Sequence, residues 1–294
     1  MFGAAARADD PPVPGARPCG VLECVVNISE GRDQDLIARL AATAGRALLD
    51  VHTDEHHHRS VLTLVGEDAP RAVTRAAVAT LDLRRHEGVH PRIGVVDVVP
   101  FVPLAGDDAA TALAARDRFA TWAADELGVP TFLYGPERSL PEVRRGAFTT
   151  WRPDHGPATP HPTAGAIAVG ARPLLVAYNL WLAVPDVVLA RRLATAVRGP
   201  AVRALGLPVG DRAQVSLNLI DPATTGPAAV FDLVDRAART AGNRVVGAEL
   251  VGLLPEAVLR AVDEERWEQL DLAAGRTIEA RLAAGGWEPE GSGG

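Results

Sequence analysis

Four short apolar runs and two amphipathic segments occupy the first hundred residues, in the order strand, helix, strand, strand, helix, strand. The apolar runs are rich in β-branched residues and are bounded by turn residues, as is typical of strands, whereas the amphipathic segments repeat leucine, isoleucine and alanine at helical spacing. This order is that of the split βαβ arrangement of a ferredoxin-like domain. We predict strands at residues 20–27, 48–51, 60–66 and 94–101, and helices at 34–47 and 70–81.

A similar but less complete order returns in the second half of the chain. The fold class predicted from both halves is α+β, with two βαβ-type units whose sheets each need one covered face, so that a site between them is expected. The segment 148–170 holds four prolines and three glycines, and its length indicates a linker or a binding loop. We predict further helices at 107–127, 186–197, 228–241, 255–262 and 265–284, and further strands at 130–134, 174–182, 213–220 and 244–250.

Composition removes several classes of function. All 30 basic residues are arginine, so a lysine Schiff base, a pyridoxal-phosphate lysine and a Walker-type phosphate loop are excluded. The net charge of −7 argues against binding to nucleic acid. No run approaches the roughly 18 apolar residues of a membrane span, and we expect no membrane partner. Two cysteines, Cys19 and Cys24, are too few for a secreted disulfide framework, so a cytoplasmic location is expected.

The eight histidines all lie between residues 52 and 161. An active site would gather imidazoles on loops that flank strands, because imidazole is suited to proton transfer near neutral pH. A solvated loop would also produce the run 56–58, since three adjacent side chains cannot face one way. The turn that carries His86, His90 and Arg92 combines a base with a carboxylate-binding fork, or else is a helix end with favourable charges.

Several motifs together resemble those of the glutamate formimidoyltransferase family, which also forms the N-terminal part of formimidoyltransferase-cyclodeaminase. The resemblance covers about residues 20–265. It is carried by ECVVNISEGRD (23–33), LLDVHTDEHHHRSV (48–61), RRHEGVHPRIGVVDVVPFVP (84–103), GPATPHPTAGAIAVGARPLLVAYNL (156–180), AQVSLNLID (213–221) and VVGAELVGLLP (245–255).

The resemblance implies transfer of a formimidoyl group from N-formimidoyl-L-glutamate to N5 of tetrahydrofolate, a co-substrate, with release of glutamate, in histidine degradation and one-carbon metabolism. It implies two ferredoxin-like βαββαβ subdomains with facing sheets and a tunnel between them, in a homodimer. We expect subdomains at 20–172 and 173–286, with disordered segments at 1–19 and 287–294. The match leaves no room for a cyclodeaminase domain in this chain.

The resemblance also assigns roles to particular residues. The family's catalytic base, the histidine of the H-P-R motif, is His90 here, and it would accept the proton that N5 loses. Arg59 and Arg92 are candidates for the glutamate carboxylates of both substrates. Other candidates for substrate binding are His58 and the strand residues Asn27, Ser216 and Asn218. The family's folate-binding segment falls on Gly156, Pro157, Ala158, Thr159, Pro160, His161, Pro162, Thr163, Ala164 and Gly165.

The chain departs from the family pattern at four positions. His58 stands where asparagine is usual, Val26 and Ile28 replace proline and phenylalanine, and Ala164 replaces an aromatic residue of the animal enzymes. Two alternatives stay open. One is a paralogue that acts on another amidine or pteridine. The other is a metal-dependent hydrolase whose ligands are His52, His56 and His58 with Asp50 or Asp54.

Overall fold

The computed structural model describes residues 21–88, 91–104 and 109–287. The base predicted at His90 and the expected disordered segment 1–19 lie outside the described residues, as do residues 288–294 of the expected tail. Trp287, which was assigned to that tail, is described, and its Nε1 donates a hydrogen bond to the Arg46 carbonyl oxygen at 3.3 Å.

The first sheet has the strand order of a ferredoxin-like domain. Its strands run β2-β3-β1-β4-β6-β5, and β1 pairs antiparallel with both β3 and β4. Helix α1 begins as predicted but ends early, because Gly45 takes a φ of 55° and a 3₁₀ turn follows. The predicted order is confirmed by β1 (Leu22–Ile28), α1 (Gln34–Ala42), β2 (Leu48–Asp54), β3 (Arg59–Val65), α2 (Asp68–Thr80) and β4 (Val96–Pro103).

Two further strands extend this sheet beyond β4. Helix α3 (Ala109–Leu127) leads to β5 (Thr131–Tyr134), and α4 (Leu140–Gly146) precedes β6 (Ile167–Ala171). The interpretation of 148–170 as a loop is wrong over its last residues, because β6 begins there and pairs in parallel between β4 and β5. All of β6 is buried, so its sequence lacks the polar alternation that indicates a half-exposed strand.

The second sheet repeats the order of the first. Its strands run β10-β7-β9-β8, so the first and third strands of the unit lie in the middle, as in β2-β3-β1-β4. Strand β8 was not predicted. It is an edge strand and contains Pro208, a residue that argues against a strand when only sequence is considered. The elements are β7 (Val176–Leu182), α5 (Val187–Val197), β8 (Val202–Val209), β9 (Arg212–Leu219), α6 (Pro227–Thr240) and β10 (Val245–Val251).

The C-terminal region differs from the prediction. Helix α7 (Glu256–Arg260) is shorter than expected, and the helix predicted at 265–284 is wrong except for α8 (Ile278–Ala284). Asp271 interrupts it with a φ of 53°, because its Oδ2 accepts hydrogen bonds from Leu250 N at 2.7 Å and Arg276 Nη1 at 2.8 Å. These long-range contacts override the local helical periodicity. No helix in the described ranges is long and apolar enough to cross a membrane.

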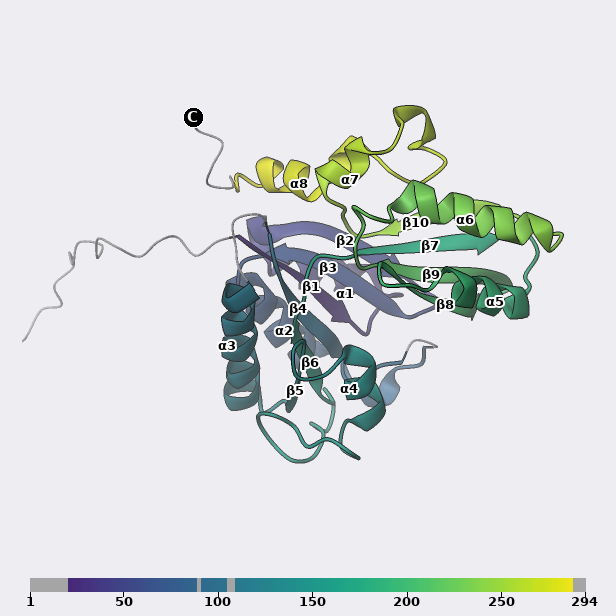
Figure 1. Ribbon diagram of the computed structural model, residues 1–294. Helices are drawn as coiled ribbons and strands as arrows, with labels where there is room; N and C mark the ends of the chain where they lie inside the picture. The colour runs from purple at the N-terminus through teal and green to yellow at the C-terminus, as the bar shows by residue number, and fades with distance from the viewer. Residues whose placement is uncertain (1–20, 89–90, 105–108, 288–294) are drawn as a thin grey trace, which may run out of the picture.

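The two sheets turn their polar faces toward each other. Helices α1, α2 and α3 pack on the opposite face of the first sheet, and α5 and α6 pack on that of the second (Figure 1). His52 Nε2 on β2 lies 3.2 Å from Glu249 Oε1 on β10, which joins the sheets directly. A small apolar cluster links the two subdomains at one end and consists of Leu49, Val65, Leu253, Ile278 and Leu282. The expected α+β fold with two facing ferredoxin-like sheets is therefore confirmed.

Candidate functional site

The turn between β2 and β3 brings the run of histidines to the rim of the facing sheets. Asp54 ends β2, and its Oδ1 accepts hydrogen bonds from the backbone nitrogens of His56 and His57, both at 2.8 Å. The other oxygen of Asp54 lies 2.5 Å from His57 Nδ1. Burial alone would raise the pKa of Asp54, but these hydrogen bonds and the His57 ring lower it to about 2. The ionised carboxylate thus orients the His57 ring.

His58 takes a left-handed backbone conformation, with a φ of 50°, and turns its ring to the opposite side. Its Nε2 lies 3.1 Å from Glu30 Oε1, and its Nδ1 lies 2.8 Å from the Glu87 carbonyl oxygen. The ring stacks on His86, with 4.1 Å between ring centroids. Both ring nitrogens of His58 therefore face oxygen acceptors.

Glu30 organises the loop that follows β1. Its Oε1 also accepts hydrogen bonds from the backbone nitrogens of Gly31, Arg32 and Asp33, at 2.9, 2.7 and 3.0 Å. Although burial raises the pKa of Glu30, these donors and the His58 ring lower it below its usual value. One carboxylate thus holds the start of α1 and the hairpin tip together. Glu30 was not among the predicted site residues, although it lies in the quoted motif at 23–33.

Gly88, two residues before His90 in the chain, lies close to the hairpin tip. A Cβ on Gly88 would lie 2.8 Å from Arg92 Nη2, 2.8 Å from the His57 carbonyl oxygen and 2.9 Å from His58 Cβ. Only glycine permits this approach, because any larger side chain would push the loop away. His90 itself lies outside the described residues, so its prediction as a base is untested.

Three arginines gather around a buried carboxylate on β4. Arg144 Nη2 donates a hydrogen bond to Asp97 Oδ2 at 2.5 Å, and Asp97 is 2% exposed. Burial lowers the pKa of Arg59 to about 10; Asp97 opposes this shift, and the charges of Arg144 and Arg92 add to it. Burial likewise lowers the pKa of Arg92, and Asp97 opposes that shift. A third arginine, Arg144, thus lies near the predicted pair Arg59 and Arg92.

Arg144 could not be found from spacing. It lies on α4, a helix that the sequence analysis did not predict, and 47 residues separate it from Asp97. Helix α4 begins with a capping box in which Glu142 Oε2 accepts from Ser139, and this local signal does predict a helix start. With that helix recognised, the position of Arg144 would still depend on the packing of α4 against β5 and β6.

The predicted folate-binding segment divides into two parts. Residues 156–160 are exposed, whereas Ala164 is 1% exposed and belongs to the core of the first subdomain. His161 Nδ1 accepts hydrogen bonds from Thr163 N at 3.3 Å and Ala164 N at 3.0 Å, which shapes the turn. The Ala164 carbonyl accepts from Val95 N at 2.9 Å, so the segment is tied to the strand that follows the His90 loop.

The predicted strand residues lie on both sheets. Asn27 on β1 is 6% exposed and donates to the Val25 carbonyl oxygen at 2.8 Å. Ser216 on β9 is half-buried and pairs in register with Asn179 of β7, whereas Asn218 is exposed. Asn179 Nδ2 donates to Glu249 Oε2 at 3.0 Å, and Glu249 also contacts His52. Ser216 therefore neighbours the polar contact between the sheets, and Asn27 is occupied within its own sheet.

The hydrolase alternative is disfavoured by how the histidines are used. His56 contacts Gly210 of the second subdomain, where a Cβ would meet its Nε2, while His57 turns to Asp54 and His58 to Glu30. Throughout the described part of the chain, no group of three or more His, Cys, Asp or Glu side chains is arranged to hold a metal ion.

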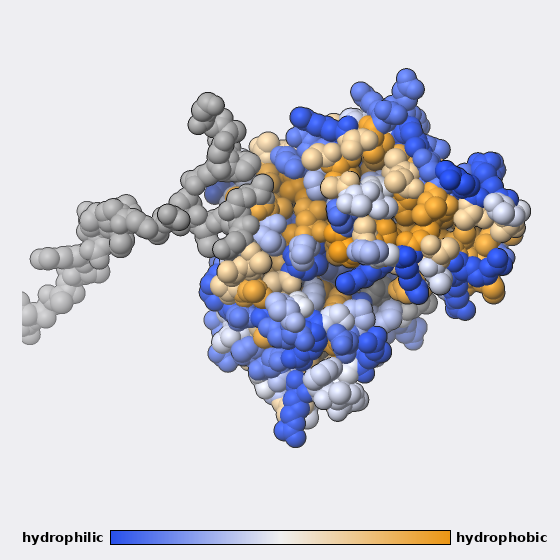
Figure 2. Space-filling model, viewed as in Figure 1, coloured by the Kyte–Doolittle hydropathy of each residue, from blue (hydrophilic) through white to orange (hydrophobic). Residues whose placement is uncertain are grey.

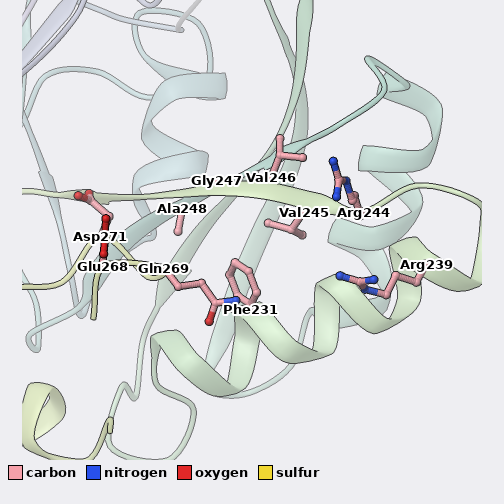
Figure 3. A pocket seen from close by; sticks show the side chains of 10 residues that line it. All are labelled: Phe231, Arg239, Arg244, Val245, Val246, Gly247, Ala248, Glu268, Gln269 and Asp271. Atoms are coloured by element: carbon pink, nitrogen blue, oxygen red, sulfur yellow. The ribbon is translucent and has the colours of Figure 1, made fainter. Parts of the chain in front are cut away.

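A pocket of about 570 Å³ lies away from these residues, along β10 beside α6 (Figure 3). Arg239 and Arg244 lie at one end, Glu268 and Asp271 at the other, and Phe231 lies between them. None of the predicted site residues lines this pocket. It is accordingly distinct from the polar contact between the sheets.

The fold and the candidate site together define a class of protein. It has two α+β subdomains, and arginine and histidine side chains lie together where the tip of the β2–β3 hairpin meets neighbouring loops. The family model described as "Formiminotransferase domain, N-terminal subdomain" matches residues 21–172, and "Formiminotransferase domain" matches residues 177–265. The chain belongs to the formiminotransferase family.

Three relatives are similar over most of this chain. Glutamate formimidoyltransferase of Streptococcus pyogenes serotype M1 is 37% identical over 83% of this chain and 92% of its own length. The enzyme of the same name from Thermoplasma acidophilum is 34% identical over 81% and 89%. Formimidoyltransferase-cyclodeaminase of Sus scrofa is 36% identical over 80% of this chain but only 50% of its own length, so this chain matches about half of that protein.

Proposed function

We propose that this protein is a glutamate formimidoyltransferase, which transfers a formimidoyl group from N-formimidoyl-L-glutamate to N5 of tetrahydrofolate and releases L-glutamate. Similarity to two glutamate formimidoyltransferases over most of their length supports this proposal. The arginines near Asp97 carry it on the structural side, because Arg144 binds this buried carboxylate and the charges of Asp97, Arg144 and Arg92 all act on Arg59.

This group of arginines suits the donor. N-Formimidoyl-glutamate carries two carboxylates, and the planar guanidinium fork of arginine binds a carboxylate bidentately. We assign Arg59 and Arg92 to these carboxylates, with His58 beside them. Gly88, two residues before His90 in the chain, lies against both Arg92 and His58.

In the proposed reaction His90 acts as general base. The N5 amine of tetrahydrofolate attacks the amidine carbon, a new C–N bond forms, and the proton lost from N5 passes to His90. The tetrahedral intermediate then breaks its bond to the glutamate nitrogen, and His90 returns the proton to that leaving group. Atoms and charge balance without a metal or a redox partner.

His57 is a second candidate for this proton transfer. The contact between Asp54 and its Nδ1 directs the proton to that nitrogen, so Nε2 is the basic position of the ring. The carbonyl of His57 lies against Gly88, two residues before His90. Parallel substitution of the two histidines therefore separates the candidates.

We further propose that tetrahydrofolate enters along residues 156–165 and lies in a tunnel between the facing sheets, lined in part by Asn27, Ser216 and Asn218. The subdomain limits predicted from sequence, 20–172 and 173–286, are retained in this proposal. They agree with the division of the described strands into two sheets.

A homodimer and a cytoplasmic location complete the proposal. On the face shown in Figure 2, apolar residues gather over the C-terminal half. Among the large apolar side chains exposed in the described residues, five belong to the second subdomain: Val184, Val188, Leu205, Leu233 and Val246. These residues are the candidates for a contact between subunits. Light scattering after size exclusion would measure the mass. Within the described residues, Cys24 is a buried thiol that forms no disulfide.

The test is a transfer assay with purified protein, formimidoyl-glutamate and tetrahydrofolate. Acid converts 5-formimidoyl-tetrahydrofolate to the 5,10-methenyl derivative, which absorbs in the near ultraviolet. We expect turnover by the wild type, loss of turnover in His90→Ala and residual turnover in His57→Ala. No product from folded wild-type protein would refute the proposed function. Loss in His57→Ala with activity retained in His90→Ala would move the base to His57.

A further inference from the structure

Gln214 on β9 is a buried amide whose hydrogen-bonding groups are not used by the protein. The residue is 0% exposed, and neither its Nε2 nor its Oε1 has a hydrogen-bond partner among the residues that the structure describes. An amide buried in this state is costly, because its donor and its acceptor have lost their hydrogen bonds to water and gained none in return. Buried polar groups are nearly always paired, so an exception of this size needs a reason.

The side chain belongs to the face of the second sheet that is turned toward the first. Ala213 and Val215 belong to the core under α5 and α6, so the alternation of β9 places Gln214 on the opposite face with Ser216. Asn179, the register partner of Ser216, reaches His52 of the first sheet through Glu249. Gln214 therefore lies on the surface where the two subdomains meet.

The neighbours of Gln214 provide an aromatic ring and a cation. Its register partner on β7 is Trp181, and the Arg212 guanidinium lies 4.1 Å from the centroid of that indole ring. At the nearby turn between β8 and β9, Gly210 meets the ring of His56 from the tip of the β2–β3 hairpin. The amide thus lies on a strand whose start contacts the histidine-bearing hairpin.

We propose that Gln214 is a specificity-determining residue that binds the edge of the pteridine ring formed by N3–H and the C4 carbonyl. This inference rests on the proposed function, since it takes tetrahydrofolate as the second substrate. A glutamine amide offers one acceptor and one donor side by side. The 4-oxopteridine edge offers the complementary pair, a donor at N3 and an acceptor at O4.

This contact would also determine the orientation of the nucleophile. The C4 carbonyl is the ring substituent next to N5, so an amide that holds N3 and O4 determines to which side N5 points. Orienting a nucleophile in this way lowers the entropic cost of the reaction. The carboxamide is required rather than a carboxylate, because a carboxylate has no donor for O4 and would repel it.

Two variants and two ligands test the inference by equilibrium binding without the donor substrate. The ligands are tetrahydrofolate and its 4-amino analogue, which has an acceptor at N3 and a donor at C4. Gln214→Leu should weaken tetrahydrofolate binding roughly 10- to 100-fold, the usual effect of deleting paired hydrogen bonds in a dry site. Gln214→Glu should weaken binding of both ligands, because a carboxylate accepts from N3–H or from the 4-amino group but repels the acceptor atom beside it.

Thr74→Val is the matched control. Thr74 is also 0% exposed, and its Oγ1 also lacks a partner in the described structure, but it lies on α2, on the helix-covered side of the first sheet. Removing that hydroxyl should leave both ligand affinities unchanged and should leave Tm equal or higher.

The outcomes separate the inference from the function on which it rests. An unchanged affinity of Gln214→Leu for tetrahydrofolate would show that Gln214 is only structural. If Gln214→Leu does not fold, an unchanged tetrahydrofolate affinity of Gln214→Glu would show the same. Wild-type protein that transfers nothing from formimidoyl-glutamate would overturn the proposed function whatever Gln214 does.

Discussion

Glu30 Oε1 lies 3.1 Å from His58 Nε2, and this contact ties the loop after β1 to the tip of the hairpin between β2 and β3. The two residues are 28 positions apart, and both side chains are largely shielded from solvent. Because the same oxygen accepts three backbone N–H groups, the position of His58 and the start of α1 depend on one carboxylate.

Replacing Glu30 by glutamine should lower the free energy of unfolding by about 1–3 kcal/mol, since hydrogen bonds to a charged acceptor are lost. The pKa of Glu30 is lowered in the folded protein, so its contribution is present above the pKa of the unfolded chain and is lost as pH falls toward the lowered value. Denaturant unfolding at pH 7 and pH 4 measures this. Glu126→Gln, at an exposed ion pair with Arg75, is the control and should change stability little.

Arg144→Gln should raise the KM for formimidoyl-glutamate at least about tenfold, because one arginine of the carboxylate-binding group is lost. It should also destabilise the protein, since Asp97 loses a buried partner. The double variant Arg144→Gln with Asp97→Asn should recover most of the stability but not the KM. Recovery of both in steady-state kinetics and thermal melts would assign Arg144 to the fold alone.

Gly88→Ala should reduce kcat about tenfold or more with a small effect on Tm, because the added Cβ would push residue 88 away from the His57 carbonyl and from His58, two residues before the proposed base. Gly199→Ala is the matched substitution, since a Cβ there would meet nothing within 4 Å. Turnover by both variants at saturating substrate measures the effect. Equal activities would mean that the close approach at Gly88 has no catalytic consequence.

The contact between His52 and Glu249 should couple the stabilities of the two subdomains. Hydrogen bonds from His52 and Asn179 lower the pKa of Glu249 against the effect of burial, so this carboxylate stays charged in mild acid. A double-mutant cycle with His52→Ala and Glu249→Gln should give a coupling energy of about 1 kcal/mol in denaturant unfolding. A coupling energy near zero would argue against this contact as a link between the sheets.

Glu23 should make the protein less stable as pH rises. Burial raises its pKa to about 7, with Arg172 opposing and Glu279 adding to the shift. The unfolded chain therefore releases this proton first, and stability falls between about pH 4.5 and pH 7 and is level above. Glu23→Gln should gain on the order of 2–3 kcal/mol relative to wild type at pH 8 and almost nothing at pH 4.5. Thermal melts of both proteins across this range would detect the divergence.

The local residue pattern was sufficient to predict those helices and strands whose buried and exposed positions follow the expected periodicity. Strands β1 and β3 are bounded by turn residues, and α2 repeats small apolar residues on one face, so their order indicated a ferredoxin-like unit. Strands β6 and β8 were missed for non-local reasons. The first is buried on all sides between β4 and β5, and the second contains Pro208 at a sheet edge. The helix expected at 265–284 failed because Asp271 binds Leu250 on a distant strand.

The candidate site likewise combines features that the sequence predicts with features that only tertiary contacts determine. The residue types near the hairpin tip, and the motifs in which Arg59, Arg92 and His58 lie, could be read from the sequence because chemistry depends on side-chain type. Their grouping with Arg144 and Asp97, and the placing of Gln214 on the inner face of β9, depend on contacts between elements far apart in the chain. Such contacts leave no local periodicity. The sequence therefore determined the order of the elements and the chemical groups available, and the packing of two sheets determined which of those groups meet.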